Sequence, residues 1–217
     1  MDERVRIHSA LADRHRLAIV DALALGDRTP GELAGMAGLP GNLLAHHLNA
    51  LDHVGLIRRR ISDGDRRRRY ISLRADRLGQ LAPARPMELG MVLFVCAHNS
   101  ARSQLAAALW RDRTSLPCDS AGTEPAARVH PKAADVAGHA GLDLSGAIPK
   151  GYESVRRPPA LVVSVCDRAR EAGVPFDAPT LHWSVPDPVA DGRSAAFRSV
   201  LAELSSRIDR LAAAAAN

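Results

Sequence analysis

A short polar loop between two segments of regular structure constrains this chain more than any other feature. An apolar run at residues 91–95 leads into Cys96, and a predicted helix begins near Ser103. A buried strand that feeds a loop and then a helix is typical of an α/β domain with a parallel sheet, whose site lies at the carboxyl ends of the strands. A second apolar run at residues 161–165 and a last helix predicted over about 194–215 fit this layout. Residues 90–217 are therefore predicted to form an α/β domain.

The loop carries the groups needed to hold a phosphate-like oxyanion. Backbone N–H groups of such a loop, together with the following helix N-terminus, can surround a tetrahedral dianion. The same positive field favours the nucleophilic thiolate of Cys96, and Arg102 can bind two oxyanion oxygens at once. We expect Ser103 to hydrogen-bond the thiolate and Asn99 to brace the loop. The predicted oxyanion-binding residues are Ala97, His98, Asn99, Ser100, Ala101, Arg102 and Ser103.

Chemistry at this loop also needs an acid that protonates a leaving oxygen. Asp187 is the best candidate because Pro186 and Pro188 stiffen its loop, although a simple turn aspartate would look the same. Three other aspartates lack such a frame: Asp167, Asp177 and Asp191.

The first part of the chain predicts a different fold. An amphipathic helix is expected over 4–25, then a short helix over 30–37 with Thr29 as N-cap, and a longer helix over 42–54. Two strand-like runs follow around an Asp-Gly turn at 62–65, which predicts a β-hairpin. This order is that of a winged helix-turn-helix, mainly α with a hairpin wing, over residues 1–80. Residues 81–89, which contain Pro83 and Pro86, are the predicted linker.

The charge of the chain indicates DNA as the partner of this first domain. The net charge of +5 lies entirely within residues 1–86, which hold 15 arginines and 10 acidic residues. Seven of these arginines are on the hairpin, a concentration that favours a polyanion over a plain helical bundle. The second helix of a helix-turn-helix enters the major groove, where an asparagine can pair with adenine. The predicted DNA contacts are Asn42, Leu43, His46, His47, Arg58, Arg60, Arg66, Arg67, Arg68 and Arg69.

Composition excludes several other classes. The three cysteines have no CxxC spacing, so we expect neither a disulfide scaffold nor a zinc knuckle. We also expect no metal site and no bound cofactor. No apolar run approaches the roughly 20 residues that cross a bilayer, and the polar start does not read as a signal peptide. A cytoplasmic protein without membrane contact is therefore expected.

The N-terminal motifs resemble one family of regulators. Leu48 and Leu51, then 55–57 (Gly-Leu-Ile), then an arginine hairpin that ends at 70–73 (Tyr-Ile-Ser-Leu), resemble the ArsR-type winged-helix repressors. The resemblance implies a homodimer on a palindromic double-stranded DNA operator, with the first helix in the dimer interface. Many members sense metal through cysteines before the recognition helix, whereas this region contains none, so metal sensing is not expected here.

Residues 90–213 resemble the low-molecular-weight tyrosine phosphatase fold and, within it, the arsenate reductases. The motifs are 96–104 (Cys-x-x-Asn-Ser-x-Arg-Ser-Gln), 120–125 (Ser-Ala-Gly-Thr-Glu-Pro), and His182-Trp183 ahead of Asp187-Pro188. The resemblance implies that Cys96 attacks arsenate, Arg102 binds it and Asp187 is the general acid.

Cys166 matches the first resolving cysteine of thioredoxin-linked arsenate reductases. Their second resolving cysteine would fall near Gly173, and it is missing. Either a Cys96–Cys166 disulfide is the final one, or an external thiol completes the cycle, from a thioredoxin, mycothiol or glutathione system.

The leading expectation is a regulator of arsenic resistance fused to a domain that binds arsenate or phosphate and reduces arsenate. One alternative is an oxyanion or redox sensor that controls DNA binding without turnover. Another is a low-molecular-weight tyrosine phosphatase tethered to DNA, which the aromatic content of 3% disfavours.

Overall fold

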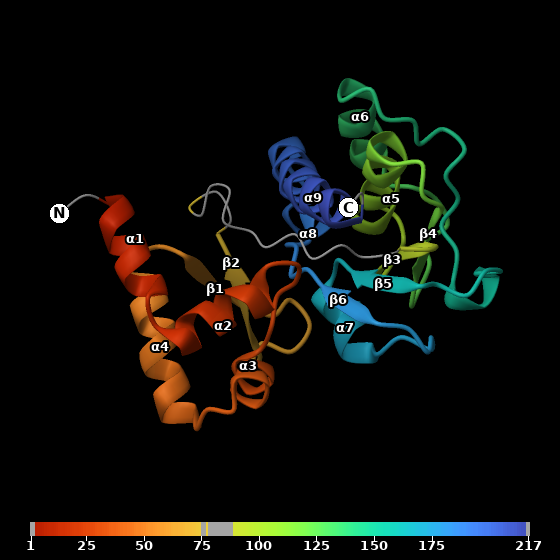
Figure 1. The fold of residues 1–217 in the computed structure, drawn as a ribbon. Coiled ribbons are helices and arrows are strands. Elements are labelled where there is room, and N and C mark those ends of the chain that lie inside the picture. Colours follow the sequence, from red (N-terminus) through yellow and green to blue (C-terminus); the bar gives the residue numbers. More distant parts are fainter. Residues whose placement is uncertain (1–2, 75–76, 78–88, 216–217) are drawn as a thin grey trace. The chain divides into compact units, whose positions relative to one another are not determined.

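The computed structural model describes residues 3–74, 77 and 89–215, and within residues 3–4 only the backbone. Apart from residues 63–65, one compact unit lies within residues 1–84 and a second within residues 85–217 (Figure 1). Residues 81–88 of the expected linker lie outside the described part of the chain.

The first unit consists of helices followed by an antiparallel hairpin, as the sequence predicts. The prediction of a single helix over 4–25 is wrong, because this segment forms two helices. Asp13 ends the first helix by capping the second: its carboxylate accepts the backbone N–H groups of His15 at 2.9 Å and Arg16 at 3.0 Å. The elements are α1 Glu3–Leu11, α2 Arg14–Leu23, α3 Pro30–Ala37, α4 Gly41–His53, β1 Ile57–Ile61 and β2 Arg69–Leu73.

The start of α3 confirms the capping motif read from the sequence. The Thr29 hydroxyl accepts the Glu32 backbone N–H, and the Glu32 carboxylate accepts the Thr29 backbone N–H at 2.8 Å. The apolar faces of the helices and the hairpin then close one core, which includes Ile19, Leu33, Leu44, Leu51, Leu56 and Ile71. This core packs α4 against the hairpin. The order of the elements is that of a winged helix-turn-helix.

The second unit is an α/β domain, and its sheet is parallel throughout, as expected. Its strand order is β4-β3-β5-β6, and every residue of the central strand β3 is buried. The helices α5, α6 and α9 pack together. The elements are β3 Val92–Cys96, α5 Arg102–Arg113, β4 Cys118–Gly122, α6 Pro131–His139, η2 Tyr152–Ser154, β5 Leu161–Ser164, α7 Asp167–Ala172, β6 Thr180–His182, α8 Pro188–Asp191 and α9 Ser194–Ala215.

The strand order places the site of this domain. From β3 the chain moves to β4 on one side, while β5 pairs with β3 on the other side. The carboxyl ends of β3 and β5 therefore form a topological switch point, where α/β sheets bind their ligands. Cys96 ends β3 and Cys166 follows β5, so both thiols lie at this edge. In the described part of the chain, no helix is both long and apolar enough to cross a membrane.

Candidate functional site

The Cys96 thiol is held inside the loop that follows β3. Its sulfur lies 3.0 Å from the Ser103 hydroxyl and accepts the Asn99 backbone N–H at 3.2 Å. Cys96 is buried, as are all loop residues from 97 to 103 except the half-buried His98. The loop thus presents a sulfur with two hydrogen-bond partners at the N-terminus of the twelve-residue helix α5.

Asn99 is the central brace of the loop. Its φ of +46° lies in the left-handed region that asparagine tolerates better than most residues. Its side-chain amide donates to the Ser103 hydroxyl at 2.8 Å and accepts from Gln104 Nε2 at 3.1 Å and from the Lys150 backbone N–H at 2.9 Å. This network fixes the hydroxyl that touches Cys96, and Gln104 and Lys150 are braces that the sequence did not single out for this role.

The chain after β4 forms a wall along the loop. The backbone N–H groups of Glu124, Ala126 and His130 donate to loop carbonyls at 2.8–3.0 Å. At Gly122, a Cβ would lie 2.5 Å from the Ala97 carbonyl oxygen and 2.9 Å from the Asn99 nitrogen. Glycine at this position therefore lets β4 approach the loop.

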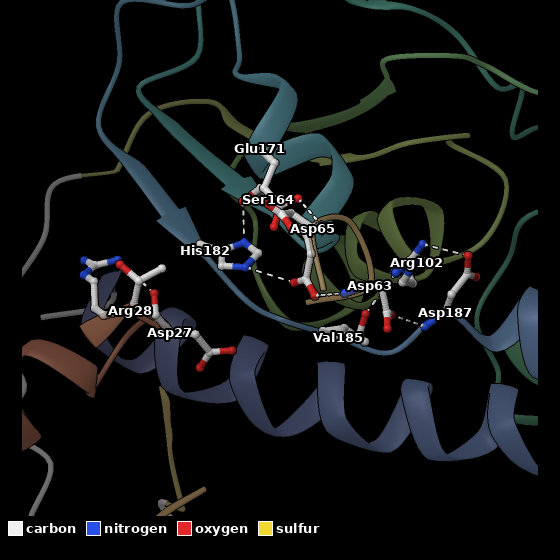
Figure 2. A network of polar contacts seen from close by, with 12 residues as sticks. Asp27, Arg28, Asp63, Asp65, Arg102, Ser164, Glu171, His182, Val185 and Asp187 are labelled. Atoms are coloured by element: carbon white, nitrogen blue, oxygen red, sulfur yellow. Dashed lines mark hydrogen bonds and ion pairs between the residues drawn. The ribbon is translucent and has the colours of Figure 1, made fainter. Parts of the chain in front are cut away.

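Arg102, the last but one residue of the loop, forms an ion pair with Asp187. Arg102 is 4% exposed and donates from Nη1 to the Val185 carbonyl at 2.9 Å, while its Nη2 lies 3.3 Å from Asp187 Oδ2 (Figure 2). The second Asp187 oxygen accepts the Val189 backbone N–H at 3.1 Å and caps α8. Burial lowers the pKa of Arg102, but negative charge on the neighbouring sulfurs and on Asp187 raises it by more. The pKa therefore lies above its ordinary value, and the guanidinium stays charged.

The three other candidate aspartates lie away from Arg102. Asp177 is exposed, and Asp191 forms an ion pair with Arg193 at 2.7 Å. Asp167 is buried beside the His182 imidazole, 3.2 Å from Nε2. Among these four carboxylates, only Asp187 has a described contact with Arg102.

Cys166 lies against the Cys96 loop. It precedes α7, and the backbone N–H groups of Ala169 and of Ala97, the residue after Cys96, lie close enough to lower the pKa of its thiol. Burial raises the pKa of Cys166, and Arg102 and these two N–H groups lower it by less. The Cys166 thiol is therefore mainly protonated, and it lies next to the Cys96 loop.

Tyr152 is a neighbour of both thiols that sequence reasoning missed. It lies on η2, close enough for a negative charge on Cys96 or Cys166 to act on its pKa, and its buried hydroxyl has no hydrogen-bond partner among the described atoms. Burial and the two sulfurs raise its pKa well above the ordinary range, so it remains a phenol. No sequence signal marks it, because η2 and β3 are far apart in the chain.

A cavity of about 540 Å³ opens beside the loop. The loop contributes His98 and Ser100, the wall contributes Arg128 and His130, and α8 contributes Val189. Its lining has no acidic side chain and no phenyl, phenol or indole ring. The cavity therefore suits an anion better than an aryl group.

The helix α4 presents part of the face predicted to meet DNA. Asn42, Leu43 and His46 are exposed, as expected for residues that reach base edges. His47 does not lie on this face: it is 5% exposed and its Nδ1 is 3.6 Å from Asp13 Oδ1. The spacing of His47 with Leu44, Leu48 and Leu51 is that of one helix face, which explains its burial.

The wing distributes its arginines as follows. Arg66, Arg67, Arg68 and Arg69 are exposed, whereas Arg58 and Arg60 on β1 are half-buried. Arg59 lies 3.3 Å from Asp52 and donates to the Asn49 side chain, so it braces α4 against the hairpin. No group of three or more potential metal-ligand side chains occurs within the described residues.

Comparisons with known proteins match each of the two units to a protein family. Residues 91–217 match the model of the low molecular weight phosphotyrosine protein phosphatases, and residues 4–59 match that of the bacterial regulatory proteins of the arsR family. An arsenate reductase from Archaeoglobus fulgidus DSM 4304 is 33% identical, covers 56% of this chain and 98% of its own, and has a TM-score of 0.50.

Two further solved structures are similar at lower scores. An arsenate reductase in the phosphate-binding state is 27% identical over 58% of this chain and 98% of its own, with a TM-score of 0.47. The YwlE arginine phosphatase from Geobacillus stearothermophilus is 23% identical over 57% of this chain and 90% of its own, with a TM-score of 0.46. Through residues 91–217 the chain belongs to the low molecular weight phosphotyrosine protein phosphatase family, and it carries an arsR-family helix-turn-helix domain before it.

Proposed function

We propose that the second unit reduces arsenate to arsenite, and that the first binds operator DNA, so that the chain is a regulator of arsenic resistance carrying its own reductase. The observation that carries the reductase assignment is the hydrogen bond from the Val165 N–H to the Val95 carbonyl at 2.8 Å, which joins the residues directly before Cys166 and Cys96. A phosphatase needs one nucleophilic thiol, whereas a reductase needs a second one within reach of the first.

Binding begins with an exchange of partners at Arg102. The arsenate dianion enters the loop and replaces Asp187 as the anion next to the guanidinium, while the loop N–H groups and the α5 N-terminus surround its oxygens. Ser103 and the Asn99 N–H hold the Cys96 sulfur for attack. Asp187, released from Arg102, is then free to take up a proton.

The first chemical step joins sulfur to arsenic. The Cys96 thiolate attacks arsenate, one As–O bond breaks, and Asp187 donates a proton so that the oxygen leaves as water. The product is a thiol–arsenate adduct on Cys96, still bound by Arg102.

The second step transfers two electrons to arsenic. Cys166 loses its proton and attacks the Cys96 sulfur, so a Cys96–Cys166 disulfide forms. The S–As bond breaks with its electron pair left on arsenic, which passes from As(V) to As(III) and departs as arsenite. An external thiol, from a thioredoxin or a low-molecular-weight thiol system, then reduces the disulfide and is itself oxidised.

Steady-state assays of the full chain test this assignment. Arsenate with a thioredoxin–NADPH or glutathione system should give turnover, which Cys96→Ser and Cys166→Ser both abolish. Hydrolysis of an aryl phosphate separates the alternative, because a phosphatase needs Cys96 but not Cys166. Aryl phosphate hydrolysis that survives in Cys166→Ser, with no arsenate reduction in the native chain, would overturn the reductase proposal in favour of a phosphatase.

For the first unit, we propose that α4 enters the major groove of a palindromic operator as part of a homodimer, and that the wing contacts flanking phosphates. Asn42 pairs with adenine and the exposed Leu43 packs on a thymine methyl. His46 serves as a further donor or acceptor. Arg66, Arg67, Arg68 and Arg69 supply the cations, with the half-buried Arg58 and Arg60 behind them.

Salt-dependent binding to operator fragments tests this surface. Arg67→Ala should weaken binding to every sequence and reduce the slope of log K against log salt by about 0.9, the contribution of one phosphate contact. Asn42→Ala should instead relax the choice of base with the slope unchanged. Arsenate-dependent release of DNA without any arsenite would favour a sensor over an enzyme. Salt-insensitive binding by the native chain would overturn the role of the wing.

A further inference from the structure

We propose that His182 is a positioning residue for Cys166: its imidazole ties Ser164 to Asp167 and thereby holds the segment that carries the second thiol against the Cys96 loop. The proposal builds on the function above in one respect, that Cys166 is the thiol that closes the disulfide. It concerns a buried polar cluster that the chemistry of the loop does not otherwise use.

The cluster spans the two sides of Cys166. Ser164 ends β5 and is paired in register with His182 at the end of β6. The His182 Nδ1 lies 2.8 Å from the Ser164 hydroxyl (Figure 2), and its Nε2 lies 3.2 Å from the Asp167 carboxylate. One ring therefore connects the residue two positions before Cys166 with the residue directly after it.

The protonation of the cluster follows from its neighbours. Burial raises the pKa of Asp167, but the hydrogen bonds and charge of its neighbours, His182 first among them, together lower it by more, so the carboxylate is ionised. An ionised carboxylate only accepts hydrogen bonds, so His182 Nε2 carries a proton. The other ring nitrogen, Nδ1, is hydrogen-bonded to the Ser164 hydroxyl, which can also donate to the Leu181 carbonyl at 3.4 Å. Asp167 and His182 are each 1% exposed, and buried groups of this kind are costly unless their partners stay in place.

The element that carries Cys166 needs such an anchor. The helix α7 has only six residues, Asp167–Ala172, and Gly173 ends it with a φ of +82°. Helices this short are not stable alone in water, so tertiary contacts must hold them. Asp167 is the first residue of α7, and its contact with His182 fixes the helix end nearest to the thiol. Loss of that contact should loosen Cys166 before it loosens the sheet.

Two measurements on the full chain distinguish positioning from general support of the core. The first is the rate at which iodoacetamide alkylates Cys166, with the half-buried Cys118 as an internal reference. The second is the equilibrium of the Cys96–Cys166 disulfide in a glutathione buffer, where each disulfide formed converts one glutathione disulfide into two glutathione thiols. Neither measurement contains arsenate.

A matched pair of variants separates the two contacts of the ring. In His182→Gln the amide nitrogen stands near the place of Nε2 and can still donate to Asp167. In His182→Asn the amide stands near the place of Nδ1 and can reach Ser164 only. Both replacements are uncharged, and both remove the ring.

We expect His182→Asn to alkylate at Cys166 about ten-fold faster, the change in local opening that follows loss of one hydrogen bond to a charged group. Its disulfide equilibrium constant should fall about ten-fold, which corresponds to about 30 mV in the two-electron potential. His182→Gln should stay within about two-fold of the native chain in both, because its amide nitrogen can still donate to the Asp167 carboxylate. Asp167→Asn, which removes the charge but not the volume, should change both in the direction of His182→Asn.

Val200→Ala controls for a general loss of stability, because it opens a cavity in α9, a helix that packs on α5, α6 and α8. It should lower the unfolding midpoint without moving either Cys166 readout. Equal behaviour of the Asn and Gln variants, or native values in both His182→Asn and Asp167→Asn, would overturn the proposal. Failure of arsenate turnover with these results intact would instead overturn the proposed reductase and leave the role of His182 standing.

Discussion

Arg102 Nη2 lies 3.3 Å from Asp187 Oδ2, at the mouth of a loop whose sulfur is 3.0 Å from the Ser103 hydroxyl. The residue suited to bind an oxyanion thus already holds a carboxylate. An incoming dianion and Asp187 compete for the same guanidinium, so binding of the one releases the other. This arrangement joins recognition of the substrate to the delivery of an acid.

Asp187→Asn separates these two roles. The amide cannot donate a proton as an acid does, so turnover of arsenate should fall by about 10²–10⁴-fold. Binding of arsenate should not weaken, and should tighten, because an uncharged amide competes less for Arg102. Competition of arsenate with a phosphate-analogue probe gives the affinity, and arsenite release gives the rate. Equal losses of affinity and rate would contradict the exchange of partners.

Gly122→Ala tests the approach of β4 to the loop. A Cβ there would meet the Ala97 carbonyl at 2.5 Å and the Asn99 nitrogen at 2.9 Å, and both are backbone atoms that cannot swing away. Oxyanion binding, measured by titration calorimetry with arsenate or phosphate, should be lost or reduced at least about ten-fold, with folding retained at a cost of about 1–3 kcal/mol. Gly138→Ala is the matched control, because nothing lies within 4 Å of its Cβ and it is inside α6. That control should bind normally and gain up to about 1 kcal/mol of stability.

The local elements of both units could be predicted from sequence, because their signals are local. The Thr29–Glu32 capping box, the buried strand ahead of Cys96 and the last helix all depend on neighbours within a few residues. The break at Asp13 was missed because apolar spacing continues across it, while one carboxylate begins a new helix there.

Contacts within the candidate site divide in the same way. The Cys96–Ser103 contact and the role of Asn99 as a brace depend on residues of one loop and were expected, whereas the contact of Asn99 with Ser103 was not. Tyr152 beside the thiols and the His182–Asp167 pair depend on which strands become neighbours, and sequence spacing does not report strand order. His47 is different: its place on the leucine face of α4 was visible in the sequence, and its polarity led to the wrong face being chosen.

The pH dependence of the disulfide-forming step should follow Cys166. Burial raises the pKa of this thiol, so at neutral pH it is mostly protonated, and its reactivity should increase about ten-fold per pH unit until that raised pKa is reached. Alkylation of Cys166 in a Cys96→Ser, Cys118→Ser chain measures this, against glutathione as a thiol of ordinary acidity. A plateau near the usual thiol value of about 8.5 would show that burial does not control Cys166.

The first unit should lose stability in mild acid because of His47. Burial lowers the pKa of His47, and His15, His46 and Arg16 lower it further, while the Asp13 carboxylate acts in the opposite direction. The unfolded chain takes up a proton at about pH 6.5 that the folded unit resists, so stability falls as the pH decreases below that value towards the lowered pKa. Hydrogen exchange of the α4 amides, followed in the full chain, should show faster opening at the lower pH. His47→Leu should flatten this dependence, and an unchanged slope would assign it to other groups.

A single-turnover reaction tests the central claim most directly. The fully reduced chain is mixed with arsenate in the absence of any external thiol, and arsenite and the disulfide are both quantified by mass spectrometry. We predict one arsenite released per chain and one Cys96–Cys166 disulfide formed in step with it, with neither product in Cys166→Ser. Arsenite without that disulfide, or no arsenite from a chain that binds arsenate, would contradict the account.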